Sequence, residues 1–207
     1  MRKKHIIFDM DGTLAATATA TALAIGEAKK KYNLPAVTDY QIRDAMGLGG
    51  LEFYTKLFPA LPEETLKKIE PEIDDHEDAS IQKIGRAILF PGVYEMLNDL
   101  FESGHSLYIA STGSSRHVQV TLDAAEIKTF FTDIHCGELQ KIDMVKRIIA
   151  GRDTRDWIMV GDMYKDSEAA HGNNILALGA GYGYLAKEDI ELFDRVLEKP
   201  GDITNYL

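Results

Sequence analysis

Short apolar runs alternate with amphipathic segments along most of this 207-residue chain. Five runs have the length and the flanking turn residues of buried parallel strands, at 5–9, 106–111, 133–136, 157–161 and 175–178. Between the later runs, apolar residues recur at helical spacing, as in Val93, Met96, Leu97, Leu100 and Phe101. Strands that alternate with helices in this way predict an α/β fold with a Rossmann-like, doubly wound parallel sheet as its core.

The segment between the first two runs breaks this alternation. From about residue 15 to residue 87, the pattern predicts helices at 17–31, 42–58 and 63–84 and no strand. A crossover between parallel strands needs only about a dozen residues, far fewer than this segment has. The sequence therefore predicts a catalytic core of residues 1–14 and 88–207, interrupted by an inserted α-helical cap of residues 15–87.

Charge and cysteine content narrow the possible partners. The chain carries 23 basic against 33 acidic residues, a net charge of −10, which argues against a nucleic-acid partner because such a partner needs a basic face. The single cysteine, Cys136, rules out an internal disulfide and suits a reducing compartment. No uninterrupted apolar run approaches the ~18 residues of a membrane span. We expect a cytoplasmic protein without membrane contact, and its oligomeric state stays open.

Polar side chains stand where the predicted strands end, at the edge where chemistry gathers in a parallel sheet. The first strand ends at Asp9 and Asp11, and Gly12 then allows the chain to turn. Two carboxylates this close suit Mg²⁺, or a nucleophile beside a proton donor. Later strand ends add two hydroxyls, a lysine and a second carboxylate pair, namely Ser111, Thr112, Lys141, Asp162 and Asp166.

Each of these features alone also has a structural explanation. A serine at a strand end commonly caps a turn, and Asp162 and Asp166 suit the N-terminus of the following helix. Their joint occurrence at successive strand ends favours a catalytic site. We interpret the other polar features as structural. The glycines of 47–50 are predicted as turns, residues 74–78 as a solvated face or loop of the cap, and the six histidines lack the spacing of a zinc site.

In these motifs the sequence strongly resembles the haloacid dehalogenase-like hydrolases, a family of aspartate-nucleophile phosphatases. The resemblance runs along nearly the whole chain, through residues 9–13, 90–93 and 161–166 together with Ser111 and Lys141. Residues 180–184 and the helical insert are similar to the phosphoglycolate phosphatase-like members, which carry a helical cap. Relatives commonly have Asp-Ser where Ala16 and Thr17 stand here, so a contact from that acid is absent.

The resemblance implies a role for each acid. Asp9 would attack phosphorus and form an aspartyl-phosphate. Asp11 would protonate the leaving oxygen and later take a proton from the water that hydrolyses the intermediate. Mg²⁺ would be held by Asp9, by the backbone carbonyl of Asp11 and by Asp162. Asp166 would bind the metal through water or orient the site.

The resemblance also implies how the phosphate is held. Ser111, with backbone N–H groups near Thr112, would bind the phosphoryl oxygens, and Lys141 would add positive charge. Asp11 narrows the activity, because dehalogenases and phosphonatases of the family lack an acid at that position. An acid there points to phosphomonoester hydrolysis or phosphosugar mutation.

The sequence therefore predicts a Mg²⁺-dependent phosphatase acting on a small phosphorylated metabolite, such as phosphoglycolate, a nucleotide or a sugar phosphate. A mutase of the β-phosphoglucomutase type shares every motif and stays an alternative. A non-catalytic binding protein on the same scaffold is a weaker one, since the acids, the serine and the lysine are all intact. The cap shows no residue pattern that identifies a ligand, so the substrate and the cap residues that contact it stay open.

Overall fold

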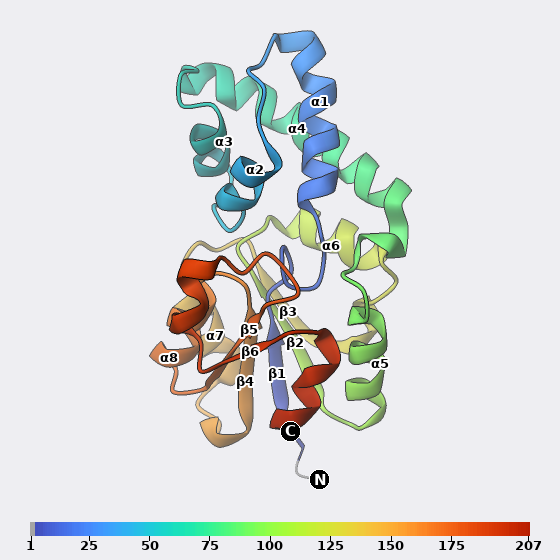
Figure 1. The fold of residues 1–207 in the computed structure, drawn as a ribbon, viewed down its shortest axis with the longest axis vertical. Coiled ribbons are helices and arrows are strands. Elements are labelled where there is room, and N and C mark those ends of the chain that lie inside the picture. The colour runs from blue at the N-terminus through green and yellow to red at the C-terminus, as the bar shows by residue number, and fades with distance from the viewer. Residues whose placement is uncertain (1–2) are drawn as a thin grey trace.

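Six parallel strands form one sheet in the order β3-β2-β1-β4-β5-β6. The computed structural model describes residues 3–207 (Figure 1). The strands are β1 (His5–Phe8), β2 (Ser106–Ser111), β3 (Phe131–Cys136), β4 (Trp157–Gly161), β5 (Leu176–Ala180) and β6 (Arg195–Leu197). Because β1 lies at the centre between β2 and β4, the carboxyl ends of these three strands meet at one edge. The predicted α/β fold with a doubly wound sheet is confirmed.

Helices cover both faces of the sheet because both faces are apolar. Ile6 and Phe8 of β1 pack in the same buried cluster as apolar residues of α5 (Val93–Glu102) and α6 (Ser115–Ala124). Ile7 points to the other face and packs with α7 (Lys141–Ile149) and α8 (Tyr164–Gly172). Single-turn and longer 3₁₀ segments complete the core at Lys128–Phe130, Thr154–Asp156, Lys187–Leu192 and Pro200–Tyr206.

Four helices between β1 and α5 stand beyond the carboxyl edge of the sheet (Figure 1). They are α1 (Ala18–Tyr32), α2 (Asp39–Ala45), α3 (Leu51–Leu57) and α4 (Glu63–Ile84), followed by a 3₁₀ turn at Gly85–Ile88. We call residues 15–87 the cap. The cap has a hydrophobic cluster of its own, which includes Ile25, Ile42, Phe58 and Ile73. This separate cluster supports the predicted division into core and cap, which we keep as a proposal.

The chain leaves and re-enters the core at one place. The backbone N–H of Ala16 donates to the carbonyl of Ile88 at 2.7 Å, and the N–H of Phe90 donates to the carbonyl of Leu14 at 3.1 Å. An isolated antiparallel bridge joins Ala15 to Leu89 between these two bonds. The two linkers between core and cap therefore run side by side as a short paired ribbon.

Most predicted elements are present, with two differences. The helix predicted over 42–58 is wrong, because Gly47, Gly49 and Gly50 separate α2 from α3, and Gly47 and Gly50 adopt positive φ angles of 82° and 53°. Strand β6 is not anticipated, since three residues that include the exposed Arg195 carry no strand pattern. Within residues 3–207, no helix combines the length and the apolar character needed to cross a membrane.

Candidate active site

The carboxyl end of β1 places Asp9 at the centre of the site. The strand ends at Phe8, and the N–H of Asp9 continues the pairing with a bond of 2.9 Å to the carbonyl of Val160 in β4. Ser111 is the last residue of β2, and Asp162 follows the last residue of β4. Parallel pairing with β1 therefore brings three polar side chains from distant parts of the sequence to the same edge.

Three buried carboxylates meet at this edge. Asp9, Asp162 and Asp166 each offer an oxygen atom, and these atoms lie within 4.8 Å of one another. Asp166 is fixed by the start of α8, where its Oδ2 accepts the N–H groups of Asp162 (3.1 Å) and Met163 (3.0 Å). Asp162 accepts a hydrogen bond of 2.7 Å from the hydroxyl of Thr13. Hydrogen bonds from the protein itself thus fix the orientations of the Asp162 and Asp166 carboxylates.

Lys141 joins the group from the start of α7. Its ammonium donates to Asp9 Oδ1 and to Asp166 Oδ1, each at 2.7 Å, and all three side chains are buried. Alternation along β1 explains the meeting, because Asp9 follows Ile7 on the face of the sheet that α7 and α8 cover. Burial lowers the pKa of the lysine, but the two carboxylates outweigh this and raise it above its usual value.

The charges of this group do not balance. Three carboxylates face one ammonium, so ionisation of all three leaves two negative charges in a buried space. Burial raises the pKa of Asp9 to about 7, with the charge of Asp166 adding to the effect and Lys141 opposing it. Burial and the charges of Asp9 and Asp166 also raise the pKa of Asp162 well above its usual value. An oxygen-coordinated divalent cation would restore the balance, so the donor set fits Mg²⁺.

Asp11 faces a different direction from these three acids. Its Oδ1 accepts a hydrogen bond of 2.8 Å from the hydroxyl of Thr17, and His117 Nε2 lies 2.8 Å from the same oxygen. Burial opposes the charge of Asp11, yet the imidazolium of His117 and the Thr17 hydroxyl hold its pKa below the usual value. Burial likewise opposes the charge of His117, while Asp11 and Glu77 raise its pKa to about 10. The carboxylate of Asp11 lies outside the three-acid group, so the predicted metal contact rests on its backbone carbonyl and stays a prediction.

Two of the predicted phosphate-binding residues, Ser111 and Thr112, begin the turn that runs past Asp11. Ser111 is buried, and its Oγ accepts the N–H of Gly113 at 3.1 Å. A Cβ atom on Gly113 would lie 3.4 Å from Asp11 Oδ2, so this turn runs directly past the acid. The hydroxyl of Thr112 donates to the carbonyl of Gly47 at 3.3 Å and so contacts the cap. Because its hydroxyl is engaged in this bond, Thr112 would bind a phosphate through its backbone N–H.

Glycines allow the loops of the site to approach one another. Gly12 has a φ of +86°, and a Cβ there would lie 2.2 Å from Asp162 Oδ2. Gly183 lies against Gly12 so closely that a Cβ would come within 1.9 Å of the Gly12 carbonyl oxygen. The N–H of Tyr184 donates to that same carbonyl at 3.0 Å. The run 180–184 therefore supports the turn that follows Asp9 and Asp11.

Several residues that contact the acids were not anticipated from the sequence. His117 stands in no recognisable motif, and its contact arises only when α6 packs against the site. Thr13 belongs to the motif of residues 9–13, but no contact to Asp162 was predicted for it. Thr17 directly follows Ala16, the position where an acid was noted as absent, and its hydroxyl donates to Asp11. The prediction of a solvated face or loop at 74–78 is wrong for Asp74, Glu77 and Asp78. These lie on α4 and line a pocket that opens onto Asp11.

Comparisons with known sequences agree with this geometry. The haloacid dehalogenase-like hydrolase family model matches residues 6–180. A phosphoglycolate phosphatase of Haemophilus influenzae (strain 86-028NP) is 27% identical over 198 residues, which cover 87% of this chain and 87% of that protein. A phosphoglycolate phosphatase of Vibrio vulnificus (strain CMCP6) is 27% identical over 201 residues, covering 90% and 87%.

Solved structures share the fold. A predicted phosphoglycolate phosphatase from Haemophilus somnus 129pt superposes with a TM-score of 0.89 at 24% identity, covering 100% of this chain and 98% of that one. A β-phosphoglucomutase from Clostridium difficile gives a TM-score of 0.78 at 16% identity, covering 98% and 93%. These likenesses concern the fold, whereas the family model spans most of the chain and confirms the resemblance and the enzyme class, a phosphoric monoester hydrolase. The chain belongs to the haloacid dehalogenase-like hydrolase family.

Proposed function

We propose that this protein is a Mg²⁺-dependent phosphatase that hydrolyses a small phosphomonoester through an aspartyl-phosphate on Asp9. One observation carries the proposal: Asp9 lies in a cluster of three buried carboxylates with Asp162 and Asp166, and the ammonium of Lys141 donates to it at 2.7 Å. The lysine fixes one oxygen of Asp9 in place. The family relationship favours the same reaction, because the relatives that match along most of their length are named phosphatases.

In the first step, a carboxylate oxygen of Asp9 forms a bond to phosphorus while the bond from phosphorus to the ester oxygen breaks. The departing alcohol takes a proton from Asp11. Before the reaction that proton lies on His117, whose Nε2 is 2.8 Å from Asp11 Oδ1, so His117 passes it to the Asp11 carboxylate, which donates it to the alcohol. In the second step, water adds to phosphorus, Asp11 accepts its proton, and phosphate leaves Asp9.

Mg²⁺, held by Asp9, Asp162 and Asp166 with the backbone carbonyl of Asp11, would neutralise charge between the anionic nucleophile and the anionic phosphate. Lys141 contributes a fixed positive charge beside Asp9 and holds its Oδ1, which orients the carboxylate. Ser111 and the backbone N–H groups that follow it would bind the remaining phosphoryl oxygens.

The test is phosphate release from p-nitrophenyl phosphate and a panel of common phosphorylated metabolites, with and without Mg²⁺. We expect Mg²⁺-dependent release by the wild type and a fall in kcat of about 10⁴-fold or more in Asp9→Asn, the scale at which loss of a covalent nucleophile is felt. Asp143→Asn, an exposed carboxylate change on α7, serves as the control and should keep full activity. Unchanged activity in a folded Asp9→Asn variant would refute the proposed nucleophile.

The mutase alternative is tested with the same protein. β-Glucose 1-phosphate is supplied with a catalytic amount of the corresponding bisphosphate, and products are separated. Free phosphate and glucose support the hydrolase that we propose. Accumulation of glucose 6-phosphate would instead show that the aspartyl-phosphate passes its phosphoryl group to a second sugar hydroxyl.

A further inference from the structure

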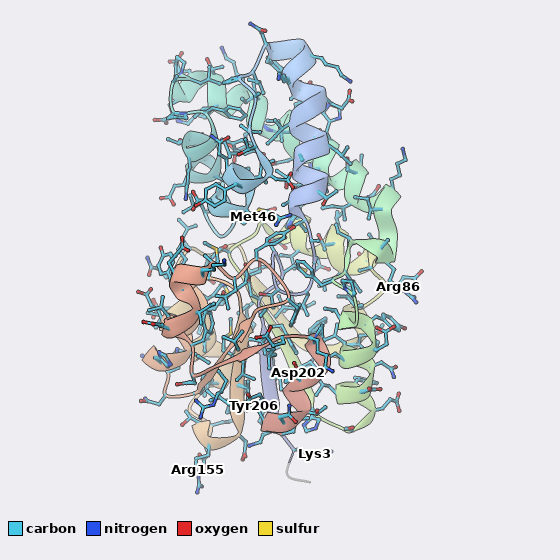
Figure 2. The ribbon with its side chains drawn as sticks, in the orientation of Figure 1. Lys3, Met46, Arg86, Arg155, Asp202 and Tyr206 are labelled. Atoms are coloured by element: carbon cyan, nitrogen blue, oxygen red, sulfur yellow. The ribbon has the colours of Figure 1, made fainter. Side chains whose placement is uncertain are left out.

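A pocket of about 160 Å³ opens beside Asp11, between the cap and the start of α6. Its core wall comprises Asp11, the turn after Ser111, Arg116 and His117, and its cap wall includes Met46, which Figure 2 labels at the edge of the cap that faces the core. Because Asp11 is the proposed proton donor to the leaving alcohol, this pocket receives the alcohol half of the ester. A cavity of about 150 Å³ holds a ligand the size of benzene, so the alcohol is small.

Helix α4 presents a row of acids to this pocket, which we call the acidic stripe. Glu70, Asp74, Glu77 and Asp78 follow one another at helical spacing and line one side of the cavity. The neighbouring face of the same helix carries Leu66, Ile69 and Ile73, which are buried in the cluster of the cap. Burial of that apolar face fixes the rotation of α4 and thereby turns the acidic stripe toward the alcohol site.

The cations of the pocket are already engaged. Among the described residues that line it, Arg116 and His117 are the basic ones. Arg116 Nη2 lies 2.7 Å from Asp75 Oδ1, and its Nε lies 2.6 Å from Asp78 Oδ2. His117 contacts Asp11 at 2.8 Å and reaches Glu77 Oε2 at 3.9 Å. Both basic side chains of the pocket are therefore already paired with acids of the protein.

Negative charge in the pocket is therefore in excess. Over residues 3–207, Glu70 and Asp74 form no salt bridge, and Asp74 is held only by the hydroxyl of Tyr54 at 2.5 Å. Asp78 is 6% exposed, and its Oδ2 accepts no well-aligned hydrogen bond although Arg116 stands within ion-pair distance. Burial raises the pKa values of Glu70 and Asp74, and a neighbouring acid adds to each shift, while Tyr54, His117 and Arg116 oppose the shift of Asp74.

Aromatic rings complete this environment. Phe53 and Tyr54 of α3 line the same pocket, with their ring centroids 5.2 Å apart and their planes nearly perpendicular. Carboxylates combined with aromatic faces stabilise an ammonium group by charge and by cation–π attraction. They would oppose a carboxylate at the same place, because it would lie among four acids and both basic side chains of the pocket are already paired.

We propose that the alcohol released by this enzyme carries a protonated amine, so that the substrate is the phosphate ester of a small amino alcohol. The inference rests on the proposed phosphatase function and adds the chemical class of its leaving group. In this respect the protein differs from what the names of its relatives indicate, because the leaving group of phosphoglycolate is a carboxylate of similar size.

Three esters of matched size test the charge preference: 2-aminoethyl phosphate, 2-hydroxyethyl phosphate and 2-phosphoglycolate. Their alcohols differ in acidity, so affinity is a cleaner comparison than turnover. Calorimetric titration of the Mg²⁺-loaded Asp9→Asn protein at pH 7.5 should give the tightest Kd for the amine. We expect it to bind about tenfold more tightly than the hydroxyl ester, the scale of one partly screened charge pair, and the carboxylate to bind most weakly.

Substitution of the acidic stripe separates charge from shape. Glu70→Gln combined with Asp74→Asn should remove most of the difference between the amine and the carboxylate. Glu63→Gln combined with Glu64→Gln, which removes the same two charges at exposed positions on the same helix, should leave it intact. The inference would be overturned if the Asp9→Asn protein bound the three esters equally, bound phosphoglycolate most tightly, or bound none of them. The proposed function has its own test, because it fails if the wild type releases no phosphate from these esters or from p-nitrophenyl phosphate.

Discussion

His117 Nε2 and Asp11 Oδ1 lie 2.8 Å apart, in a partly buried pair that joins the first turn of α6 to the loop after β1. The pair holds one proton, and the opposed pKa shifts of the two groups place it on the imidazole at neutral pH. Asp11, the proposed proton donor, is thus ionised before the reaction and receives its proton from His117. This arrangement makes the histidine a positioning residue for Asp11 and ties the cap to the same network through Glu77.

Replacing His117 by glutamine should reduce stability in a pH-dependent manner. The folded-state pKa of about 10 lies above the ordinary value of 6.5, so the stabilisation by His117 is complete below about pH 6.5 and is lost as the pH rises toward 10. The difference in unfolding free energy between wild type and His117→Gln should therefore shrink from pH 6.5 to pH 9.5, by at most about 1.4 kcal/mol per pH unit. Urea denaturation at several pH values measures it. A difference that is constant with pH would contradict the charged pair, and His76→Gln, a change at a partly exposed histidine of the cap, is measured in parallel.

Asp11→Asn should slow hydrolysis in a way that depends on the leaving group. An alkyl alcohol needs a proton as it departs, whereas p-nitrophenolate is stable without one. We expect kcat for alkyl phosphates to fall by about 10²- to 10⁴-fold, and the formation of the aspartyl-phosphate from p-nitrophenyl phosphate to fall far less. Rapid-quench measurement of the first turnover with both substrates makes the comparison. An equal loss for both would exclude Asp11 as the donor.

Gly12→Ala should weaken metal binding. A methyl group there would lie 2.2 Å from Asp162 Oδ2, and the φ of +86° is strained for alanine, so Asp162 must shift. Disturbing the surroundings of a metal ligand typically costs about 10- to 100-fold in affinity. The Mg²⁺ concentration that gives half-maximal activity reports the change. Gly201→Ala, where a Cβ meets nothing within 4 Å, is the matched control. The same half-maximal Mg²⁺ concentration in both variants would argue against metal binding by Asp162.

Lys141→Met should destabilise the metal-free protein more than the metal-loaded one. Loss of the ammonium leaves Asp9 and Asp166 buried without a cation, which typically costs about 3–5 kcal/mol. Mg²⁺ bound to the same acids would offset part of this cost. Chemical denaturation with EDTA and with Mg²⁺ measures both states, and Lys146→Met changes an exposed lysine of the same helix as the control. A variant as stable as wild type in EDTA would show that the three acids are neutral without the lysine.

Sequence patterns predicted the sheet and the acids at its edge for a common reason. Asp9, Ser111 and Asp162 each follow a buried apolar run, and parallel strands bring such positions together without further information. Lys141 was found as one member of a set of motifs, although its pattern alone is that of any helix start. Strand β6 was missed because three residues are too few to show an alternation of apolar and polar positions.

Contacts that depend on how the cap meets the core could not be predicted. His117 reaches Asp11 only because α6 begins beside the first loop, and no spacing in the sequence encodes that distance. The acids of α4 have the helical spacing of a solvated face, and the same pattern serves a solvated surface or a pocket wall. Only the burial of Ile69 and Ile73 on the adjacent face decides which of the two is realised.

The paired ribbon at Ala15 and Leu89 bears on how such enzymes diversify. A segment whose two ends already touch can be exchanged for one of another length at little entropic cost, since closing the loop depends only weakly on its size. The residues at the carboxyl edge of the sheet are then unchanged, while a single contiguous stretch of coding sequence is exchanged. New substrate ranges can arise by recombination at this junction, without any change to the chemistry beneath it.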